Sequence, residues 1–191
     1  MTNIVNIIRN FFTYELLVKA SILLKEKHAH LEELVDAEIA ATLVVLVLKT
    51  NYEGKLLAAI QLAQPFIYLK TKKPQAIIND IFHYDLLEAE GLAMQYQMLL
   101  EETFNDKLFD IIDIAAAFAD TKSMTAHRML SAITPLSFFY IEQELLKDDK
   151  NTLNSYLLNQ EENIFNAIPE DFPIIELLEI YENNQHHHLD K

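Results

Sequence analysis

Glycine is almost absent from this chain: of its 191 residues, only Gly54 and Gly91 are glycine. Phosphate-cradling loops, dinucleotide-binding fingerprints and tight hairpin turns need glycine, because a residue without Cβ adopts positive φ freely and lets a ligand approach the backbone closely. Those architectures are therefore not expected. Long periodic apolar segments joined by short polar breaks make up the rest. This pattern predicts an all-α fold, a multi-helix bundle built around buried central helices.

The composition is that of one globular domain. Hydrophobic residues make up 51% of the chain, which is enough for a packed core and untypical of a disordered chain. The length fits one domain or two small, closely packed ones, and we expect a single helical domain over residues 1–191. Cysteine is absent, which excludes disulfides, thiolate zinc sites and cysteine nucleophiles. With no secretory signal visible at the start, we expect a cytoplasmic protein.

The net charge of −14 is unevenly distributed. Residues 142–191 contain 12 acidic and 3 basic side chains, whereas residues 1–141 contain 17 and 12. An acidic surface repels phosphate backbones, so nucleic acid is not expected as a partner. A basic protein partner is compatible with this charge.

The most apolar run, residues 39–48, is the predicted centre of the fold. It continues a helical pattern that begins at Leu31, and a helix that is apolar on every side is enclosed on every side. The run is about half as long as the roughly 20 residues that a membrane-spanning helix needs. We therefore expect a buried helix over residues 31–49 and no transmembrane segment.

Polar residues and proline predict where other helices begin, end or bend. Thr13 is the expected N-cap of a helix that carries Leu16, Leu17, Ala20, Leu23 and Leu24 on one face. Asn105 is the expected end of a helix over residues 85–104. Ser123 is the expected N-cap of a long helix over residues 124–147.

Pro135 lies inside that long helix and is expected to bend it near Ser131. At the other end of the chain, residues 183–191 are expected to form a frayed tail.

Two parts of the chain follow a similar plan at a spacing of 92 to 95 positions. Residues 12–17 resemble residues 104–109, since in each an aromatic and a polar capping residue precede an amphipathic helix, a polar break and a longer apolar helix. Further along, Val35 corresponds to Leu130, Ala40 to Pro135, and Leu43 to Phe138. This pattern predicts an internal duplication of residues 4–64 and 104–169, joined by a helical segment over residues 74–103.

The second unit carries a set of short motifs at residues 104–107, 122–126, 133–135, and Leu153, Leu157, Gln160, Ile164, Ala167, Ile168 and Pro169. In these residues it resembles the YidB-like domains, a bacterial family of unknown function that is sometimes fused to OmpA-type domains. The resemblance is looser over residues 4–54, and Asn105 and Asp120 stand where the family motifs have glycine. It implies an all-helical fold and supplies no catalytic residue.

Acidic residues line one predicted helical face, namely Asp106, Asp110, Asp113 and Asp120. Paired carboxylates can hold a divalent cation or share a proton. The opposite face carries the apolar residues Phe109, Ile112 and Ala116. The acidic face is therefore interpreted as a solvated stripe.

Histidines give three further groups that could hold a metal ion. Asp80 and His83 have the i, i+3 spacing used in helical di-metal sites, which would allow metal-dependent hydrolysis, but such sites need a second copy of the motif. His28 and His30 lie near Glu26 in a polar break, and residues 186–188 are a histidine run in the tail. None of these groups is a complete site, so we expect no metal and no cofactor.

Nucleophilic catalysis has little support. Ser123 and Ser131 lie one helical turn on either side of His127, but Ser123 is explained as a cap and no glycine-built elbow is present. We therefore expect no catalytic residues and no enzymatic activity.

The residues after Pro135 provide the one candidate binding site. Core packing explains aromatic residues there, but a bend could also open a groove against the helix of residues 39–48. The candidate groove residues are Val44, Leu48, Pro135, Phe138 and Phe139.

Two functions remain open. The first is a non-enzymatic helical module that binds a protein partner or associates with itself. The alternative is a bundle that binds a small apolar or lipid-like ligand in that groove.

Overall fold

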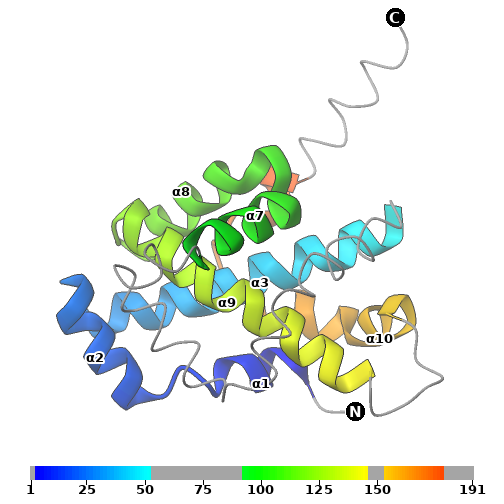
Figure 1. The fold of residues 1–191 in the computed structure, drawn as a ribbon, viewed down its shortest axis with the longest axis horizontal. Coiled ribbons are helices and arrows are strands. Elements are labelled where there is room, and N and C mark those ends of the chain that lie inside the picture. Colours follow the sequence, from blue (N-terminus) through cyan, green and yellow to red (C-terminus); the bar gives the residue numbers. More distant parts are fainter. Residues whose placement is uncertain (1–2, 53–91, 146–152, 179–191) are drawn as a thin grey trace, which may run out of the picture.

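The computed structural model describes residues 3–52, 92–145 and 153–178, and every regular element in these residues is helical (Figure 1). The prediction of an all-α multi-helix bundle is confirmed for this part of the chain. The elements are α1 (Ile4–Arg9), α2 (Tyr14–Leu24), α3 (His28–Tyr52), α7 (Leu92–Phe104), the 3₁₀ turn η2 (Asn105–Lys107), α8 (Leu108–Phe118), α9 (Ser123–Leu145) and α10 (Leu153–Phe165).

Some predictions fall on residues outside these ranges. They concern the pair Asp80 and His83, the first part of the joining segment 74–103, and the tail 183–191 with its histidine run. These stay predictions.

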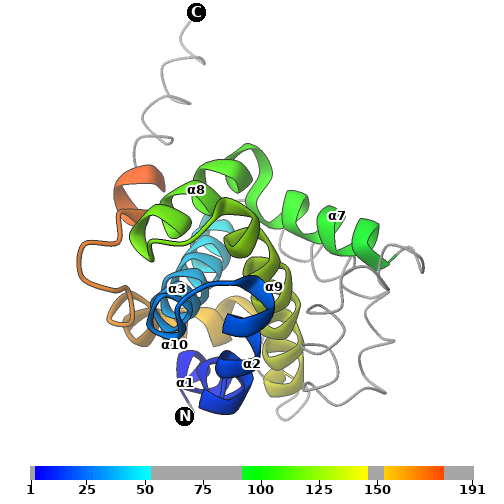
Figure 2. The same cartoon turned by 90° about the vertical axis from the view of Figure 1, so that its left-hand side faces the viewer.

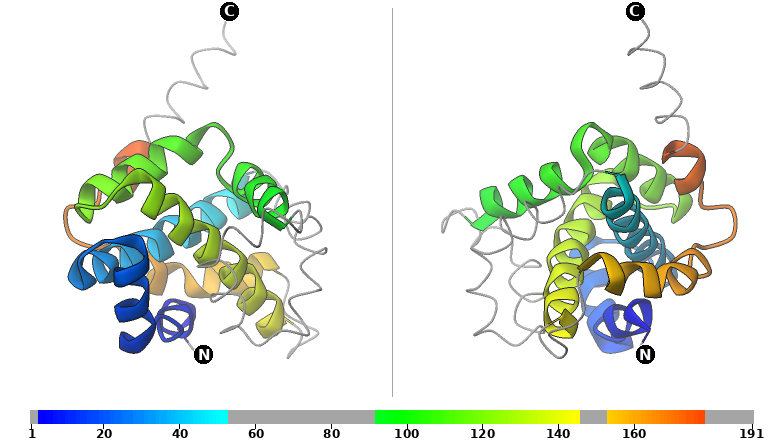
Figure 3. Two further views of the ribbon diagram at one scale, coloured as in Figure 1. Left: turned by 60° about the vertical axis from the view of Figure 1, so that its left-hand side comes forward. Right: turned by 90° about the vertical axis from the view of Figure 1, so that its right-hand side faces the viewer.

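Helix α3 is the centre of the fold. It contacts each of the other described α-helices, and Figure 3 shows it in the middle of the bundle. Every residue from Ala37 to Val47 is buried, as expected for a helix that is apolar on all sides. The helix begins at His28 instead of Leu31, because the polar residues before Leu31 form an additional first turn in which the Leu31 N–H donates to the Lys27 carbonyl (3.2 Å).

Short polar side chains start the first two helices. The Asn3 side chain accepts a hydrogen bond from the Val5 N–H (2.9 Å). The Thr13 hydroxyl accepts one from the Leu16 N–H (3.3 Å), which confirms Thr13 as an N-cap. Asn3 also accepts from the Asn6 N–H (3.4 Å), so the two caps satisfy backbone donors that a helix leaves unpaired at its start.

Helix α2 buries a narrower face than the periodicity predicts. The buried residues are Leu16, Leu17, Ala20 and Leu24. Leu23 was assigned to the same face but is 48% exposed, because at about 100° per residue it lies just outside the arc of those four residues. The helix ends at Lys25, whose φ of 57° lies in the left-handed region.

Asn105 ends α7 as predicted, with a φ of 51°. The 3₁₀ turn η2 follows, so α8 begins at Leu108. The buried stripe of α8 consists of Leu108, Ile111, Ile112, Ala115 and Ala116. The assignment of Phe109 to the buried face was wrong, since Phe109 lies outside this stripe and is 70% exposed.

Helix α9 starts at Ser123 itself and continues through Pro135. The prediction of Ser123 as an N-cap was therefore wrong, and its hydroxyl donates instead to the Asp113 carboxylate (2.9 Å). Pro135 has no N–H to donate to the preceding turn. Near it, the Ser131 and Ser137 hydroxyls each donate to a backbone carbonyl one turn earlier (2.8 Å). The bend near Ser131 stays a prediction.

Helix α10 closes the bundle beside α3 and α1. The buried Gln160 side chain accepts a hydrogen bond from the Ile4 N–H (3.3 Å) and so joins α10 to the start of α1. The chain then turns, and Phe172 packs against Phe118 with ring centroids 5.3 Å apart. Residues 174–178 are helical again.

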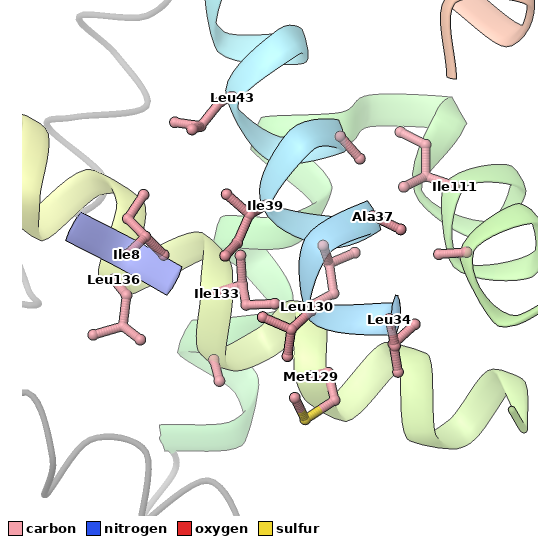
Figure 4. Packing of buried hydrophobic residues seen from close by; sticks show 14 of the residues in the cluster. Ile8, Leu34, Ala37, Ile39, Leu43, Ile111, Met129, Leu130, Ile133 and Leu136 are labelled. Atoms are coloured by element: carbon pink, nitrogen blue, oxygen red, sulfur yellow. The ribbon is translucent and has the colours of Figure 1, made fainter. Parts of the chain in front are cut away.

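One cluster of buried apolar residues extends through all the described helices. Figure 4 shows Leu34 and Ile39 of α3 near Leu130 and Ile133 of α9. The core is therefore shared between the first and second halves of the chain.

The helix pairs α2–α3 and α8–α9 follow one another along the chain at a spacing of about 95 positions. Helices α3 and α9 begin 95 positions apart, at His28 and Ser123. The turns before them contain Lys25 and Asp120, also 95 positions apart, and both have positive φ, at 57° and 49°. The residues paired by the sequence comparison, Val35 with Leu130, Ala40 with Pro135 and Leu43 with Phe138, are all buried. Helices α2 and α8 lie on separate parts of the surface (Figure 2).

Candidate functional site

The five residues of the predicted groove lie on two helices that contact each other, α3 and α9. Val44, Pro135 and Phe138 are buried, whereas Leu48 and Phe139 are partly exposed. A ligand at this place would therefore enter a region that is closed to solvent at three of its five positions. The groove stays a prediction.

The serine and histidine residues considered for catalysis are engaged elsewhere. The Ser131 hydroxyl donates to the backbone carbonyl of His127, and the Ser123 hydroxyl to Asp113. The His127 ring lies against the Gln97 amide, with Nε2 and Oε1 3.0 Å apart. Burial lowers the pKa of His127. The structure does not bring a nucleophile and a base together here.

The acidic residues of the predicted stripe are exposed, as expected. Asp110 pairs with Lys107 (3.3 Å), and Asp113 accepts the Ser123 hydrogen bond. Asp120 accepts through its backbone carbonyl from the His30 ring (2.9 Å). In residues 3–52, 92–145 and 153–178, no group of three histidine, aspartate or glutamate side chains could hold a metal ion.

The polar break containing Glu26 is a junction between the two helix pairs. Glu26 accepts hydrogen bonds from the Thr125 hydroxyl (2.9 Å) and the Lys122 N–H (3.2 Å), and pairs with the Lys122 ammonium (3.2 Å). Burial acts to raise the pKa of Glu26, but the hydrogen bonds from Thr125 and Lys122 outweigh it, and the pKa is lowered. The sequence suggested Glu26 and His30 as possible metal ligands. In the structure they instead make hydrogen bonds that join the two helix pairs.

A cleft of about 410 Å³ opens beside α1. It is lined by Val5, Asn6, Arg9, Glu33, Asp36, Ile39, Phe118, Ala167 and Pro169. Arg9 pairs with Asp36 and also donates to the Phe12 carbonyl (3.2 Å). The walls combine apolar surface with one neutralised ion pair and the additional carboxylate of Glu33. Sequence reasoning missed this cleft, because its walls come from four separate segments.

Burial raises the pKa of Asp36 above its ordinary value, the Arg9 guanidinium opposes the rise, and Glu32 adds to it. The Asp36 carboxylate is therefore partly desolvated, and the Arg9 guanidinium offsets only part of that cost.

Helix α2 presents an apolar stripe to solvent. Tyr14, Val18 and Ile22 follow one another at intervals of four residues and so lie on one face. Tyr14 is 70% exposed and Ile22 is 75% exposed. The Tyr14 ring also lies on the His28 ring, with centroids 4.7 Å apart. Sequence reasoning concentrated on the buried face of α2 and overlooked the i, i+4, i+8 spacing of this second, exposed stripe.

The exposed face of α8 differs from the α2 stripe, although the two helices correspond in the spacing along the chain. Phe109 lies 95 positions after Tyr14 and is exposed to the same extent, 70%. The exposed residues Asp110 and Asp113 lie near it in α8, and the exposed Asp106 lies in the preceding turn η2. The two faces thus share an exposed aromatic residue and differ in charge.

Glu38 is an unusual polar residue of α3, because its side chain is fully buried. Within the described part of the chain, neither carboxylate oxygen has a hydrogen-bond partner. Burial raises the pKa of Glu38 well above its ordinary value, so the carboxyl group favours its protonated form. It does not line the cleft.

Comparisons with known proteins give no relative. No family model matches the chain, and neither a curated protein nor a solved structure matches it. The resemblance to YidB-like domains therefore stays a prediction. Within the described residues, no helix combines the length and the apolar character needed to cross a membrane.

Proposed function

We propose that this protein is a non-enzymatic helical module that binds a protein through the exposed stripe of α2. The stripe is defined by Tyr14, Val18 and Ile22. A cytoplasmic location is part of the proposal.

The exposure of Ile22 and Tyr14 is the observation that carries it. The protein already has an extensive apolar core, because the buried cluster extends through all the described helices. A large aliphatic and a large aromatic side chain on one exposed helix face form the kind of apolar patch, bordered by polar residues, that marks protein contact sites.

Affinity purification from native lysate tests the proposal with three baits: the wild type, Ile22→Asp and Leu158→Asp. Leu158 is also an exposed apolar residue but lies on α10. We expect proteins retained by the wild type and by Leu158→Asp to be lost with Ile22→Asp. If all three baits retain the same proteins, the α2 stripe is not the binding surface.

A second candidate function rests on the 410 Å³ cleft, which we propose binds a small amphiphile. Its apolar walls suit an alkyl chain. Asp36 already neutralises Arg9, and Glu33 adds a negative charge. An uncharged or cationic head group therefore fits better than an anionic one.

Octylamine and octanoate, which share a chain length and differ in the charge of the head group, test this second candidate by titration calorimetry at neutral pH. We expect octylamine to bind and octanoate not to bind. Ala167→Trp should block the cleft and abolish the heat, whereas Ala29→Trp, on an exposed position of α3, should not. Equal heats for the wild type and both variants would show that octylamine does not bind in the cleft.

We further propose that the two helix pairs arose by internal duplication. The equal spacing of helix starts and of left-handed turn residues supports this, as does the matching burial of paired residues. An experimental structure in which one rotation superposes α2–α3 on α8–α9 would support the duplication, and unrelated helix paths would contradict it.

A further inference from the structure

We infer that the partner of the α2 stripe is a second copy of this chain, which docks through its α8 face. The inference rests on the proposed function and names the partner of the same surface. The α8 face is defined by Phe109 and the exposed carboxylates Asp106, Asp110 and Asp113.

The surroundings of the α2 stripe are basic. Lys19 on α2 and Lys25 and Lys27 at its C-terminal end are all exposed, and Glu15 is the one exposed acidic residue of the helix. Glu26, the next carboxylate along the chain, is held by Lys122 and Thr125. Three of the eight lysine and arginine residues in the described part of the chain therefore lie on α2 or at its C-terminal end.

The α8 face has the opposite charge. Three carboxylates surround Phe109, and the Lys107 ammonium, which pairs with Asp110, is the one positive charge among them. Both faces carry one large exposed aromatic side chain, Tyr14 or Phe109, at corresponding positions. An apolar contact bordered by opposite charges is the arrangement that specific protein interfaces use.

Charge selects this pairing over the alternatives. The chain has a net charge of −14, so most encounters between two copies are repulsive. Docking α2 on α2 would bring Lys19, Lys25 and Lys27 against their own copies. Docking α8 on α8 would bring the three carboxylates of one copy against the three of the other. The α2–α8 contact is the combination in which the charges of the two faces attract.

The contact joins two different surfaces, since α2 and α8 lie apart on the molecule (Figures 1 and 2). It is therefore a head-to-tail contact, which closes into a ring or extends as a chain of copies. The assembly is expected to weaken with salt, because exposed charges are screened beyond about 10 Å at 0.1 M ionic strength.

Light scattering after size exclusion, and sedimentation equilibrium over a range of concentrations, test the inference on the full chain. We expect the mass to rise above that of one copy with concentration, and to fall when salt is raised from about 0.05 M to about 0.5 M. Ile22→Asp should raise the dissociation constant about tenfold or more, as expected for a central apolar contact. Leu158→Asp, the matched control on α10, should leave it unchanged.

Charge reversal identifies the two faces. The double variants Lys19→Glu with Lys27→Glu, and Asp110→Lys with Asp113→Lys, should each be monomeric alone. Mixed in equal amounts, they should associate, because the acidic α2 face of one variant meets the basic α8 face of the other. Circular dichroism and the thermal midpoint check that each variant is folded.

Three results would overturn the inference. The first is a single-copy mass at every concentration. The second is association that the α8 double variant does not weaken, which would indicate α2–α2 docking. The third is a mixture that stays monomeric although both variants are folded. None of these removes the proposed function, because the bait experiment with Ile22→Asp then reports whether a different protein binds the α2 stripe.

Discussion

A buried carboxyl group without a hydrogen-bond partner, such as that of Glu38 in the described part of α3, loses the solvation that it has in the unfolded chain. Its pKa is raised by burial above the ordinary value of 4.5, so the folded protein keeps a proton that the unfolded chain releases. Stability is therefore highest at low pH for this group. It falls by about 1.4 kcal/mol per pH unit between pH 4.5 and the folded-state pKa.

Replacing Glu38 by Met, a side chain of similar length without a charge, should stabilise the protein at pH 7 by about 1–3 kcal/mol. The difference in unfolding free energy between variant and wild type should shrink as the pH falls toward 4.5. Urea unfolding followed by circular dichroism from pH 5 to pH 8 measures both effects.

Two controls accompany that experiment. Glu33→Met, at an exposed position of the same helix, should change stability by about 0.5 kcal/mol or less. His127 has a lowered pKa, so its contribution falls as pH drops through 6.5. That opposite trend is common to wild type and variant and cancels in their difference. A difference that is independent of pH would show that Glu38 does not titrate as described.

At the scale of helices and turns, residues other than glycine adopt the positive φ that glycine usually provides. Lys25, Asn105, Asp120 and Asp171 all adopt positive φ, at 57°, 51°, 49° and 66°. Asn105 could be predicted because asparagine tolerates this conformation. Lys25 could not, since lysine has no local preference for positive φ and the packing of α2 against α3 decides the turn.

The same distinction explains the errors at helix starts. Thr13 was correctly predicted as a cap, because the cap is local and depends on one hydroxyl and one nearby N–H. Ser123 has the same chemistry, but Asp113, ten residues away, accepts its hydrogen bond. That competing partner belongs to another helix, and the sequence pattern alone contains no sign of it.

The junction at Glu26 links helix pairs that are nearly a hundred residues apart in sequence. Its pKa is lowered because hydrogen bonds from Thr125 and Lys122 outweigh the effect of burial. The sign is opposite to that of Glu38: the stabilisation is present above pH 4.5 and is lost as the pH falls through the lower, folded-state pKa.

Glu26→Gln should therefore cost about 1–2 kcal/mol at pH 7 and less at pH 3. Glu15→Gln, at an exposed position in the first turn of α2, is the matched control and should change stability little at either pH. Thermal unfolding at the two pH values measures the effect. Combining Glu26→Gln with Thr125→Val should cost less than the sum of the two single changes, because the variants remove the same hydrogen bond.

At the scale of the whole molecule, the fold could be predicted from apolar periodicity but the candidate binding surfaces could not. Periodicity identifies buried faces, and so it found the central helix and the residues of α9 that pack on it. It placed the binding groove there too, where three of the five residues are buried. The α2 stripe and the α8 face depend on which side chains remain exposed once all the helices have packed, and that is a property of the assembled bundle.

Because α3 and α9 meet in one shared core, the two helix pairs are expected to unfold together. Leu130→Ala removes a fully buried side chain of α9, near Leu34 and Ile133 (Figure 4), and should cost about 2–5 kcal/mol. Hydrogen exchange should then show loss of protection in α2 and α8 alike, within a single unfolding transition.

Ile133→Val, which costs about 0.5–1.5 kcal/mol, is the substitute if the first variant does not fold. Leu158→Ala, at an exposed position, should leave protection unchanged. Loss of protection limited to α8 and α9 would show instead that each helix pair has a stability of its own.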